Sequence, residues 1–242
     1  MTRAVALALA FASASPALDP WDVLRRGDPG RLSPDSFRAL LRLWRDDRSH
    51  DIEVWHAGRN RTLVRLLSAK ELGKFLLRRD ADLWLVSPRT RQPTRLPPAY
   101  RLYGGASLDE VLGRLHFEDY EPVDLTEEKG PDGDLLSLRL HARDPGSMLP
   151  RARLLVRKGD FRAVKVEYWL RSGKPATVVE FQAWEAGRPR RLAVRDLIRK
   201  EGSVTVDVLK LEERPVPADL FDLEDGSARK ALPVPLAAAG SP

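Results

Sequence analysis

Residues 151–211 read RARLLVRKGDFRAVKVEYWLRSGKPATVVEFQAWEAGRPRRLAVRDLIRKEGSVTVDVLKL, and this stretch decides the fold. Turn signals, most of which contain glycine, divide it into short segments rich in apolar and β-branched residues. Such a series is typical of an antiparallel meander, in which neighbouring strands are joined by tight turns. The stretch therefore predicts five adjoining strands: Arg151–Lys158, Phe161–Leu170, Pro175–Glu185, Pro189–Lys200 and Ser203–Glu212.

Apolar and polar side chains alternate along most of these strands. In the second strand, Val164, Val166 and Tyr168 fall on one face, while Lys165 and Glu167 fall on the other. Because side chains alternate between the two faces of a sheet, this period predicts one buried face and one face in water. A curved sheet of this kind must cover its apolar face with helices or with a bound apolar molecule.

The segment that follows residue 32 predicts the strongest helix. Ser33 can cap it and Pro34 suits its first turn. Phe37, Leu40, Leu41 and Trp44 recur at helical spacing on one face, which would pack onto the sheet. This helix would end near residues 46–49. Two shorter helices are expected at Pro20–Arg26 and, after the cap residue Ser107, at Leu108–His116.

The rest of the chain predicts six more strands: Asp51–Ala57, Arg61–Ser68, Lys70–Arg78, Ala81–Val86, Asp119–Glu127 and Asp134–Ala142. Residues 87–98 should be irregular or a frayed hairpin, and Asp219–Phe221 should dock on the sheet. The fold class is therefore α+β, with one strongly curved antiparallel sheet of about ten or eleven strands and helices on its concave face. This domain would span residues 18–225, and residues 226–242 should form a disordered tail.

Composition limits the kinds of site that the chain can carry. The chain has 242 residues, of which 43% are hydrophobic and 31% charged, as expected for a soluble domain with a sizeable core. It has no cysteine, which excludes disulfides, thiolate metal sites and cysteine nucleophiles. The formal net charge of +6 comes from mixed signs spread along the chain, so we expect a solvated surface and no nucleic-acid partner.

The N-terminus has the pattern of a secretory signal peptide. Arg3 precedes a short apolar run, Ala4–Ala12, that is too short to span a bilayer. Small residues then place cleavage after Ala14 or Ala17. Residues 1–17 would be removed and the mature protein exported. The alternative is a frayed, alanine-rich terminus.

The polar residues give no pattern of an active site. The four histidines are not at metal-ligand spacing from one another: His50, His56, His116 and His141. Gly104-Gly105-Ala106-Ser107 lacks the nucleophile elbow, and a helix cap explains its serine. We therefore expect no catalytic residues, no metal and no cofactor, and an enzyme is the least favoured interpretation.

The apolar residues are more informative. A curved sheet with a few short helices can enclose a cavity, and apolar cavities bind acyl chains. On this hypothesis three residues of the expected lid helix contact the ligand: Phe37, Leu41 and Trp44. The strands would supply the other cavity-lining residues: Phe75, Leu77, Leu83, Leu85, Leu136, Leu138, Leu140, Leu154, Val156, Val164, Val166 and Tyr168.

Five motifs occur in an order that resembles a known family: DLWLVSP (82–88), GGASLDEVL (104–112), EDYEPVDL (118–125), VKVEYWLRSGKP (164–175) and VPADLF (216–221). Over about Leu18–Leu223 the chain resembles the outer-membrane lipoprotein-sorting proteins, the LolA-like periplasmic carriers. The resemblance is closer to the broader LolA-like group than to the classical lipoprotein chaperone.

The resemblance implies an incomplete β-barrel closed by helices that form a lid. It implies a periplasmic monomer that holds acyl chains of lipoproteins or other lipids and moves them between the inner and outer membranes. Its partners would be an inner-membrane exporter and an outer-membrane acceptor, and no catalytic residues come with it. The alternative is a periplasmic sensor or scaffold that uses the same half-barrel to bind a lipid or lipoprotein signal and a membrane partner.

Overall fold

A computed structural model describes most of the chain: residues 18–29, 34–58, 60–80, 82–87, 92–97, 100–103, 106–112, 117–199 and 202–225, with positions 229, 232, 235 and 236. The expected signal peptide, residues 1–17, lies outside the described residues. So does most of the expected tail at 226–242.

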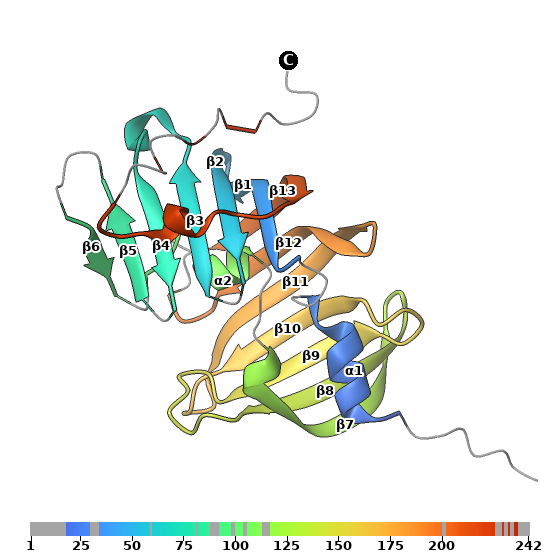
Figure 1. The fold of residues 1–242 in the computed structure, drawn as a ribbon. Coiled ribbons are helices and arrows are strands. Elements are labelled where there is room, and N and C mark those ends of the chain that lie inside the picture. The colour runs from blue at the N-terminus through green and yellow to red at the C-terminus, as the bar shows by residue number, and fades with distance from the viewer. Residues whose placement is uncertain are drawn as a thin grey trace, which may run out of the picture.

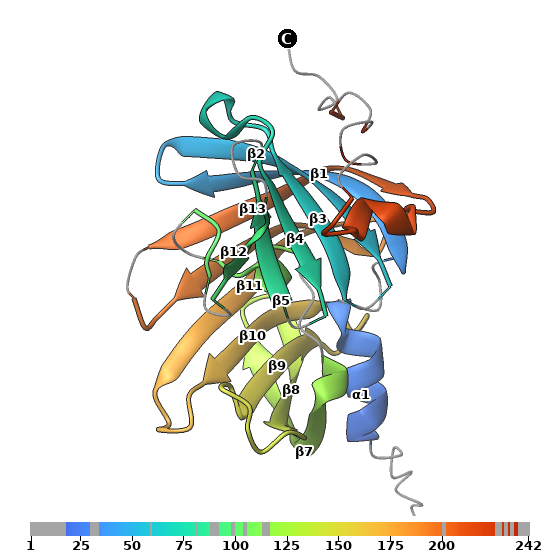
Figure 2. The same cartoon turned by 60° about the vertical axis from the view of Figure 1, so that its left-hand side comes forward.

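The described residues form a single antiparallel sheet of 13 strands (Figure 1). The strands are β1 Ser36–Arg45, β2 Arg48–Ala57, β3 Arg61–Leu66, β4 Phe75–Arg79, β5 Asp82–Val86, β6 Thr94–Leu96, β7 Tyr120–Gly130, β8 Gly133–Ala142, β9 Arg151–Arg157, β10 Ala163–Trp169, β11 Pro175–Glu185, β12 Arg188–Asp196 and β13 Ser203–Glu213. Their spatial order is β6-β5-β4-β3-β2-β1-β13-β12-β11-β10-β9-β8-β7. Figures 1 and 2 show that the sheet curls around an interior and stays open. The predicted curved antiparallel sheet is thus confirmed.

Helices are few and short in the part of the chain that the structure describes. They are α1 Pro20–Gly27 and α2 Leu108–Val111, with the 3-10 turns η2 Ala69–Glu71, η3 Phe117–Asp119 and η4 Ala218–Phe221. The prediction of a short helix from Pro20 is confirmed, and Asp19 Oδ1 accepts a hydrogen bond from the Trp21 N–H at 3.1 Å. The helix expected at Leu108–His116 starts correctly but ends at Val111, and residues 113–116 lie outside the described residues.

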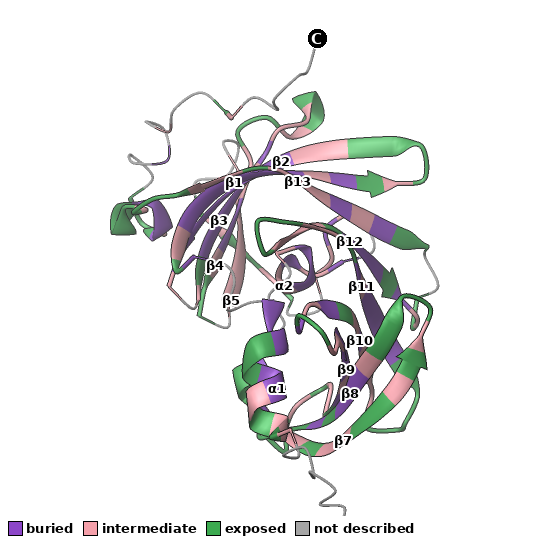
Figure 3. Cartoon of the chain, turned by 90° about the vertical axis from the view of Figure 1, so that its right-hand side faces the viewer, coloured by how far each residue is buried: buried purple, intermediate pink, exposed green. Residues whose placement is uncertain are grey.

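Helix α1 lies inside the curve, against β7, β8 and β9 (Figure 3). Val23 and Leu24 point into the core and are buried. Its last residue, Gly27, comes so close to β9 that a Cβ atom there would lie 2.5 Å from Val156 Cγ1. The absence of a side chain at Gly27 therefore lets the helix end rest directly on the sheet.

The strong helix predicted after Ser33 is wrong, because residues 36–45 form β1. Every second residue of this strand, from Phe37 to Leu43, belongs to the core, which is the period of a strand. Leu40 and Trp44 lie on the opposite face and produced the false helical spacing. On that face Arg42 donates to Asp51, which lies directly across on β2. With β1 and the short β6, which falls in the region expected to be irregular, the 11 predicted strands become 13.

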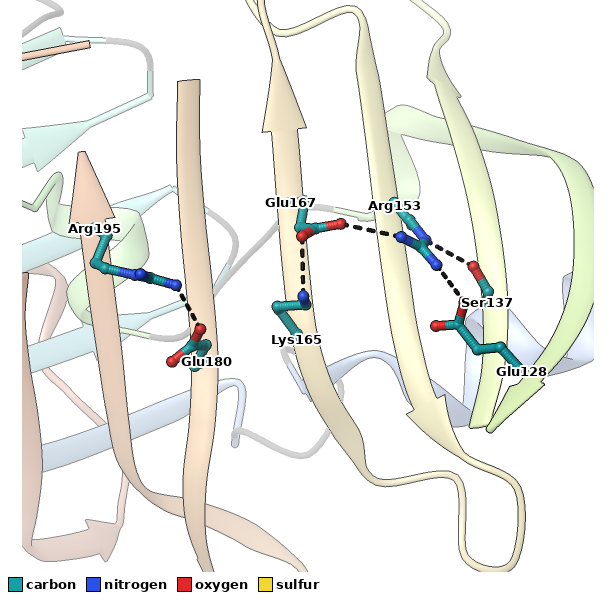
Figure 4. Close-up of polar contacts among 7 residues, drawn as sticks. All are labelled: Glu128, Ser137, Arg153, Lys165, Glu167, Glu180 and Arg195. Atoms are coloured by element: carbon teal, nitrogen blue, oxygen red, sulfur yellow. Dashed lines mark hydrogen bonds and ion pairs between the residues drawn. The ribbon is translucent and has the colours of Figure 1, made fainter. Parts of the chain in front are cut away.

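The convex face of β7–β12 carries charged side chains that pair across the strands (Figure 4). Arg153 Nε donates to Ser137 Oγ at 2.8 Å, and its guanidinium also contacts Glu128 and Glu167. Further along the sheet, Arg195 Nη2 donates to Glu180 Oε1 at 2.7 Å. Exposed pairs of this kind contribute at most about 1 kcal/mol each, but they keep this face polar.

The convex face of β2–β5 also carries an apolar cluster. Trp55, Leu63 and Leu77 form a cluster there, which we call the convex patch. Leu220 and Phe221 of η4 are 5% and 3% exposed and cover the patch from outside, over β3 and β4 (Figure 2). The segment expected to dock on the sheet therefore does so, on its convex side.

Candidate functional site

A segment between β6 and β7 crosses the inside of the curved sheet. We call its described residues, 100–103, 106–112 and 117–119, the inner segment. Its apolar side chains belong to the same core cluster as the concave side chains of the strands. Five of them are buried: Leu102, Ala106, Leu108, Val111 and Phe117. Figure 3 shows α2 within the curve, so the chain itself occupies the space that the sheet encloses.

Local hydrogen bonds shape the inner segment. Ser107 Oγ accepts a bond from the Glu110 N–H at 3.2 Å, and Glu110 Oε2 accepts one from the Ser107 N–H at 2.7 Å. This reciprocal capping stabilises the start of a helix that is only four residues long. The Leu102 N–H donates to Ala106 O at 2.7 Å and closes the preceding turn. A helix this short does not form alone in water, so packing inside the sheet maintains it.

Two ion pairs connect the inner segment to the concave face of the sheet. Arg78 of β4 pairs with Asp109, and Arg101 Nε lies 3.9 Å from Asp196 Oδ2 at the end of β12. Arg101 also donates to Glu110 Oε2 at 2.9 Å. These contacts attach the inner segment to β4 and to the end of β12, which lie far apart in the sheet. We call Arg78–Asp109 and Arg101–Asp196 the latch pairs.

Tyr103 adds a third attachment. Its hydroxyl donates to Glu71 Oε2 at 3.1 Å, and its backbone oxygen accepts a bond from Arg45 Nη1 at 3.2 Å. Its ring stacks on His50, with 4.0 Å between the ring centres. Desolvation, helped by the nearby Glu71 carboxylate, raises the pKa of Tyr103 above its ordinary value. The hydroxyl therefore keeps its proton and its bond to Glu71 at physiological pH.

A small apolar pocket lies beside the inner segment. Val111 and Leu112 form one wall, and the facing walls come from β1, β12 and β13, with Pro29: Phe37, Ala39, Leu41, Arg188, Pro189, Leu192, Val208 and Leu211. Its volume is about 40 Å³, close to the roughly 30 Å³ that one water molecule occupies. This pocket is therefore too small to hold an acyl chain.

Most of the residues predicted to line a cavity do face the concave core. Nine are buried within the core cluster: Phe37, Leu41, Leu136, Leu138, Leu140, Leu154, Val156, Val166 and Tyr168. Leu83 and Leu85 are partly buried against it. Phe37 and Leu41 reach this face from a strand rather than from a lid helix.

Phe75 and Leu77 lie on the other side of the sheet, where Leu77 belongs to the convex patch and Phe75 packs against it. Leu77 is directly opposite Trp84 on β5, and opposed residues share a face, so Leu77 and Leu83 point to different faces. The turn between β4 and β5 determines which residues of the two strands share a face. The alternation within each strand does not show this.

Trp44 and Val164 also point away from the interior, and they are 37% exposed each. Trp44 is on the outer face of β1, where its Nε1 donates to Asp207 Oδ2 at 2.9 Å. Val164 is an extra residue in β10, because the pairing with β9 passes from Ala163 to Lys165. This bulge reverses the alternation, so Val164 does not share a face with Val166.

A second, polar cavity of about 540 Å³ lies at one end of the interior, where α2 meets the start of β7 and the loop after β8. Its lining residues are Ser107, Asp109, Glu110, Asp119, Tyr120, Ala142, Arg143, Asp144, Ser147, Met148, Leu149 and Tyr168. We call this space the polar cavity. The sequence does not predict the polar cavity, because its wall comes from segments that are far apart in the chain and carry no recognisable motif.

Two tyrosines separate the polar cavity from the apolar core. The Tyr120 hydroxyl donates to Leu149 O at 2.8 Å, and the ring centres of Tyr120 and Tyr168 lie 6.3 Å apart. Desolvation, with a smaller contribution from Asp119, raises the pKa of Tyr120 to about 12. Burial likewise raises the pKa of Tyr168 well above its ordinary value. Both phenols are therefore neutral at physiological pH.

The described part of the chain shows neither a cluster of metal ligands nor a membrane-spanning helix. Within it, no three His, Cys, Asp or Glu side chains gather closely enough to hold a metal ion. None of its helices has the length and apolar character needed to cross a membrane.

Comparison with known proteins gives a consistent result. A family model described as "-like: Uncharacterized protein" matches residues 58–225. No curated protein matches the chain. Among solved structures, a LolA superfamily protein from Nitrosomonas europaea is 25% identical with a TM-score of 0.71, over 85% of this chain and 98% of that chain.

Two other structures share the fold. A putative outer membrane lipoprotein-sorting protein domain from Vibrio parahaemolyticus is 16% identical, with a TM-score of 0.65, over 84% of this chain and 97% of that one. A DUF1329 family protein from Desulfovibrio piger is 17% identical, with a TM-score of 0.64, over 86% of this chain and 97% of that one. The curved open sheet, the motif order and these matches agree: the chain belongs to the LolA-like family.

Proposed function

We propose that this protein is a periplasmic carrier that holds acyl chains of lipoproteins or other lipids inside its curved sheet and moves them between the inner and outer membranes. The observation that carries the proposal is the nature of the cover over the concave apolar face. Turns and a four-residue helix cover its centre, and they are attached through a few polar contacts at their edges. Such a cover can leave without breaking any strand pairing.

The inner segment and an acyl chain would contribute similar free energies of burial, which supports an exchange of one for the other. The four large apolar side chains that the inner segment buries contribute about 1.5–3 kcal/mol each, or roughly 6–12 kcal/mol together. A sixteen-carbon chain has about 14 methylene groups, and burying them at about 0.8 kcal/mol each contributes roughly 11 kcal/mol. Because these values are similar, the lipid can replace the inner segment at little net cost and can leave again.

The latch pairs would set how readily the exchange begins. The Arg78 and Asp109 side chains are 18% and 33% exposed, and the Arg101 side chain is 20% exposed. Water reaches these three groups, whereas the Asp196 side chain is 3% exposed and keeps two backbone hydrogen bonds to its Oδ1. Breaking each pair therefore costs less than breaking a pair in which both side chains are fully buried. In this proposal the inner segment, rather than a helix after Ser33, is the lid.

The proposed carrier role also implies a location, partners and an oligomeric state. Residues 1–17 would direct export to the periplasm, an inner-membrane exporter would supply the lipid and an outer-membrane acceptor would receive it. The carrier would act as a monomer and would not be an enzyme. The relatives named as LolA superfamily and lipoprotein-sorting proteins support the carrier role over an enzymatic one.

A direct test examines the purified protein for lipid. Organic extraction followed by mass spectrometry should recover acyl lipids in near-stoichiometric amount, and the lipid-free protein should bind a fluorescent fatty acid in a saturable way. Hydrogen exchange at residues 106–112 should increase when the fatty acid binds, because the inner segment leaves the core. Absence of both extracted lipid and uptake would refute the carrier function.

A further inference from the structure

We propose that the polar cavity binds the primary ammonium group of a lipid headgroup, so that the carrier prefers amine-bearing lipids to lipids without a cation. This inference rests on the proposed function, because it assigns the headgroup of the lipid whose chain would occupy the interior.

The Tyr168 side chain is buried and yet its hydroxyl lacks a partner. The residue is 5% exposed, and no hydrogen bond joins its hydroxyl to any described residue. No fully enclosed side-chain polar atom of the described residues lacks a partner, so this hydroxyl must be reached by solvent. Tyr168 lines the polar cavity, which is where that solvent lies. A buried phenol that faces a cavity without a partner is a polar group available to a ligand.

The aromatic rings beside this hydroxyl suit a cation. Tyr120 and Tyr168 form one wall, with their rings tilted by 54°. The faces of such rings attract ammonium groups, and paired aromatic walls are a common way to bind them. The phenol oxygen of Tyr168 can accept a hydrogen bond from an ammonium N–H.

The charge of the cavity wall agrees with a cationic ligand. Its lining includes four carboxylates and one guanidinium, that of Arg143. Asp109 and Glu110, which pair with Arg78 and Arg101, would leave with residues 106–112 when a lipid enters. Asp119 stays beside β7, because its backbone oxygen accepts a hydrogen bond from the Arg143 N–H at 2.8 Å. The remaining wall still has one more acid than base, since Asp119 and Asp144 are accompanied by Arg143 alone. Arg143 is turned toward the surface, since its guanidinium lies 5.1 Å from the Trp21 ring centre and its Nε donates to Tyr120 O at 3.3 Å.

The polar cavity also borders the place of the acyl chain. Tyr120 and Tyr168 belong to the buried core cluster, and Leu149 packs against that cluster while lining the cavity. A lipid whose chain replaced the inner segment would therefore bring its headgroup to this wall. A free amine has the same chemistry, and the test must separate the two sources.

The experiment is a calorimetric titration of the lipid-free, full-length protein with palmitate, lysophosphatidylethanolamine and lysophosphatidylglycerol of equal chain length, and with ethanolamine alone. The ethanolamine lipid should bind about tenfold more tightly than the glycerol lipid, as expected for a hydrogen bond to a charged group together with a cation–aromatic contact. Tyr168→Phe should remove most of this preference, which is measured as the ratio of the two lysolipid affinities within the same variant. The matched control is Tyr100→Phe, which removes a phenol hydroxyl outside the polar cavity and should keep the preference.

The outcomes separate the two proposals. Equal affinity for both lysolipids, or a preference that survives Tyr168→Phe, overturns the headgroup assignment while palmitate binding maintains the carrier function. Ethanolamine binding as tightly as the ethanolamine lipid overturns the assignment to a lipid headgroup. Failure of all three lipids to bind overturns both proposals.

Discussion

Arg101 Nε lies 3.9 Å from Asp196 Oδ2, and this ion pair joins the inner segment to the end of β12. Asp196 Oδ1 also accepts hydrogen bonds from the backbone N–H groups of Ile198 and Arg199, at 2.9 and 3.1 Å. Removing the arginine therefore leaves the buried carboxylate with other partners. When the pair opens, the Asp196 charge stays buried, but these two hydrogen bonds remain and lower the cost of opening, which suits a contact that must break reversibly.

Arg101→Ala should loosen the inner segment and speed lipid uptake. Loss of two partly buried ion contacts is expected to weaken the closed state by roughly 1–2 kcal/mol, or about five- to thirtyfold in the opening equilibrium. Stopped-flow association with a fluorescent fatty acid measures the rate. The matched control is Arg195→Ala, which removes an arginine pair on the convex face. Identical rates in all three proteins would show that Arg101 does not hold the segment.

A substitution that fills the small apolar pocket should block binding. Val208 is half-buried and lines this pocket, so Val208→Trp places a large ring where the acyl chain would enter. We expect at least about a tenfold loss of affinity for palmitate, because several methylene groups lose their place at about 0.8 kcal/mol each. Val164→Trp, at the exposed bulge of β10, should bind as the natural protein does. Circular dichroism melting confirms that both variants fold, and unchanged binding by Val208→Trp would contradict the site.

The packing of η4 on the convex patch should contribute several kilocalories per mole to the free energy of unfolding. Leu220 is 5% exposed against the patch, so Leu220→Ala should lower the free energy of unfolding by roughly 2–4 kcal/mol. Leu72 is 74% exposed, and Leu72→Ala should change it by less than about 0.5 kcal/mol. Urea denaturation measures both. Equal effects would mean that η4 is only loosely attached.

Asp207 should make stability depend on pH in the acid range. A hydrogen bond from Arg191 Nε at 2.5 Å, and a second from Trp44, lower the pKa of Asp207 in the folded protein. A depressed folded pKa stabilises the fold above the unfolded value, near 3.9, and this contribution disappears as the pH falls through the folded pKa.

The natural protein and Asp207→Asn should therefore differ in melting temperature at pH 6, and the difference should shrink below about pH 4. The asparagine keeps the shape of the side chain, which isolates the charge. Melting curves followed by circular dichroism between pH 2.5 and 7 provide the measurement. A difference that stayed constant across this range would show that the carboxylate charge contributes nothing.

How far the sequence predicts this fold can be seen strand by strand. Because alternation and turn signals coincide in the meander from β9 to β13, all five of its strands are predicted with ends within two residues, except that β12 ends at Asp196, four residues before its predicted end. The helix expected after Ser33 fails because the outer face of β1 carries Leu40 and Trp44, whose spacing from Phe37 and Leu41 imitates a helix. β6 has three residues, too few for any period to be visible.

The site is less predictable than the fold for physical reasons. A bulge at Val164 reverses the alternation of β10 without any proline or glycine to mark it. The position of Leu77 depends on a register that only pairing with Trp84 fixes. The sequence predicts Tyr168 as an apolar wall residue, and only the fold reveals that its hydroxyl faces a polar cavity.

The pairing of β1 with β13 also determines the order in which the molecule can be assembled. Phe37 and Glu213 are partners although they come from opposite ends of the chain. A ribosome delivers β1 long before β13, so one edge of β1 must remain bare until synthesis is nearly complete. A nascent chain that stopped before residue 203 would contain two separate meanders, each with an unprotected edge, and joining them would be the slow step of refolding.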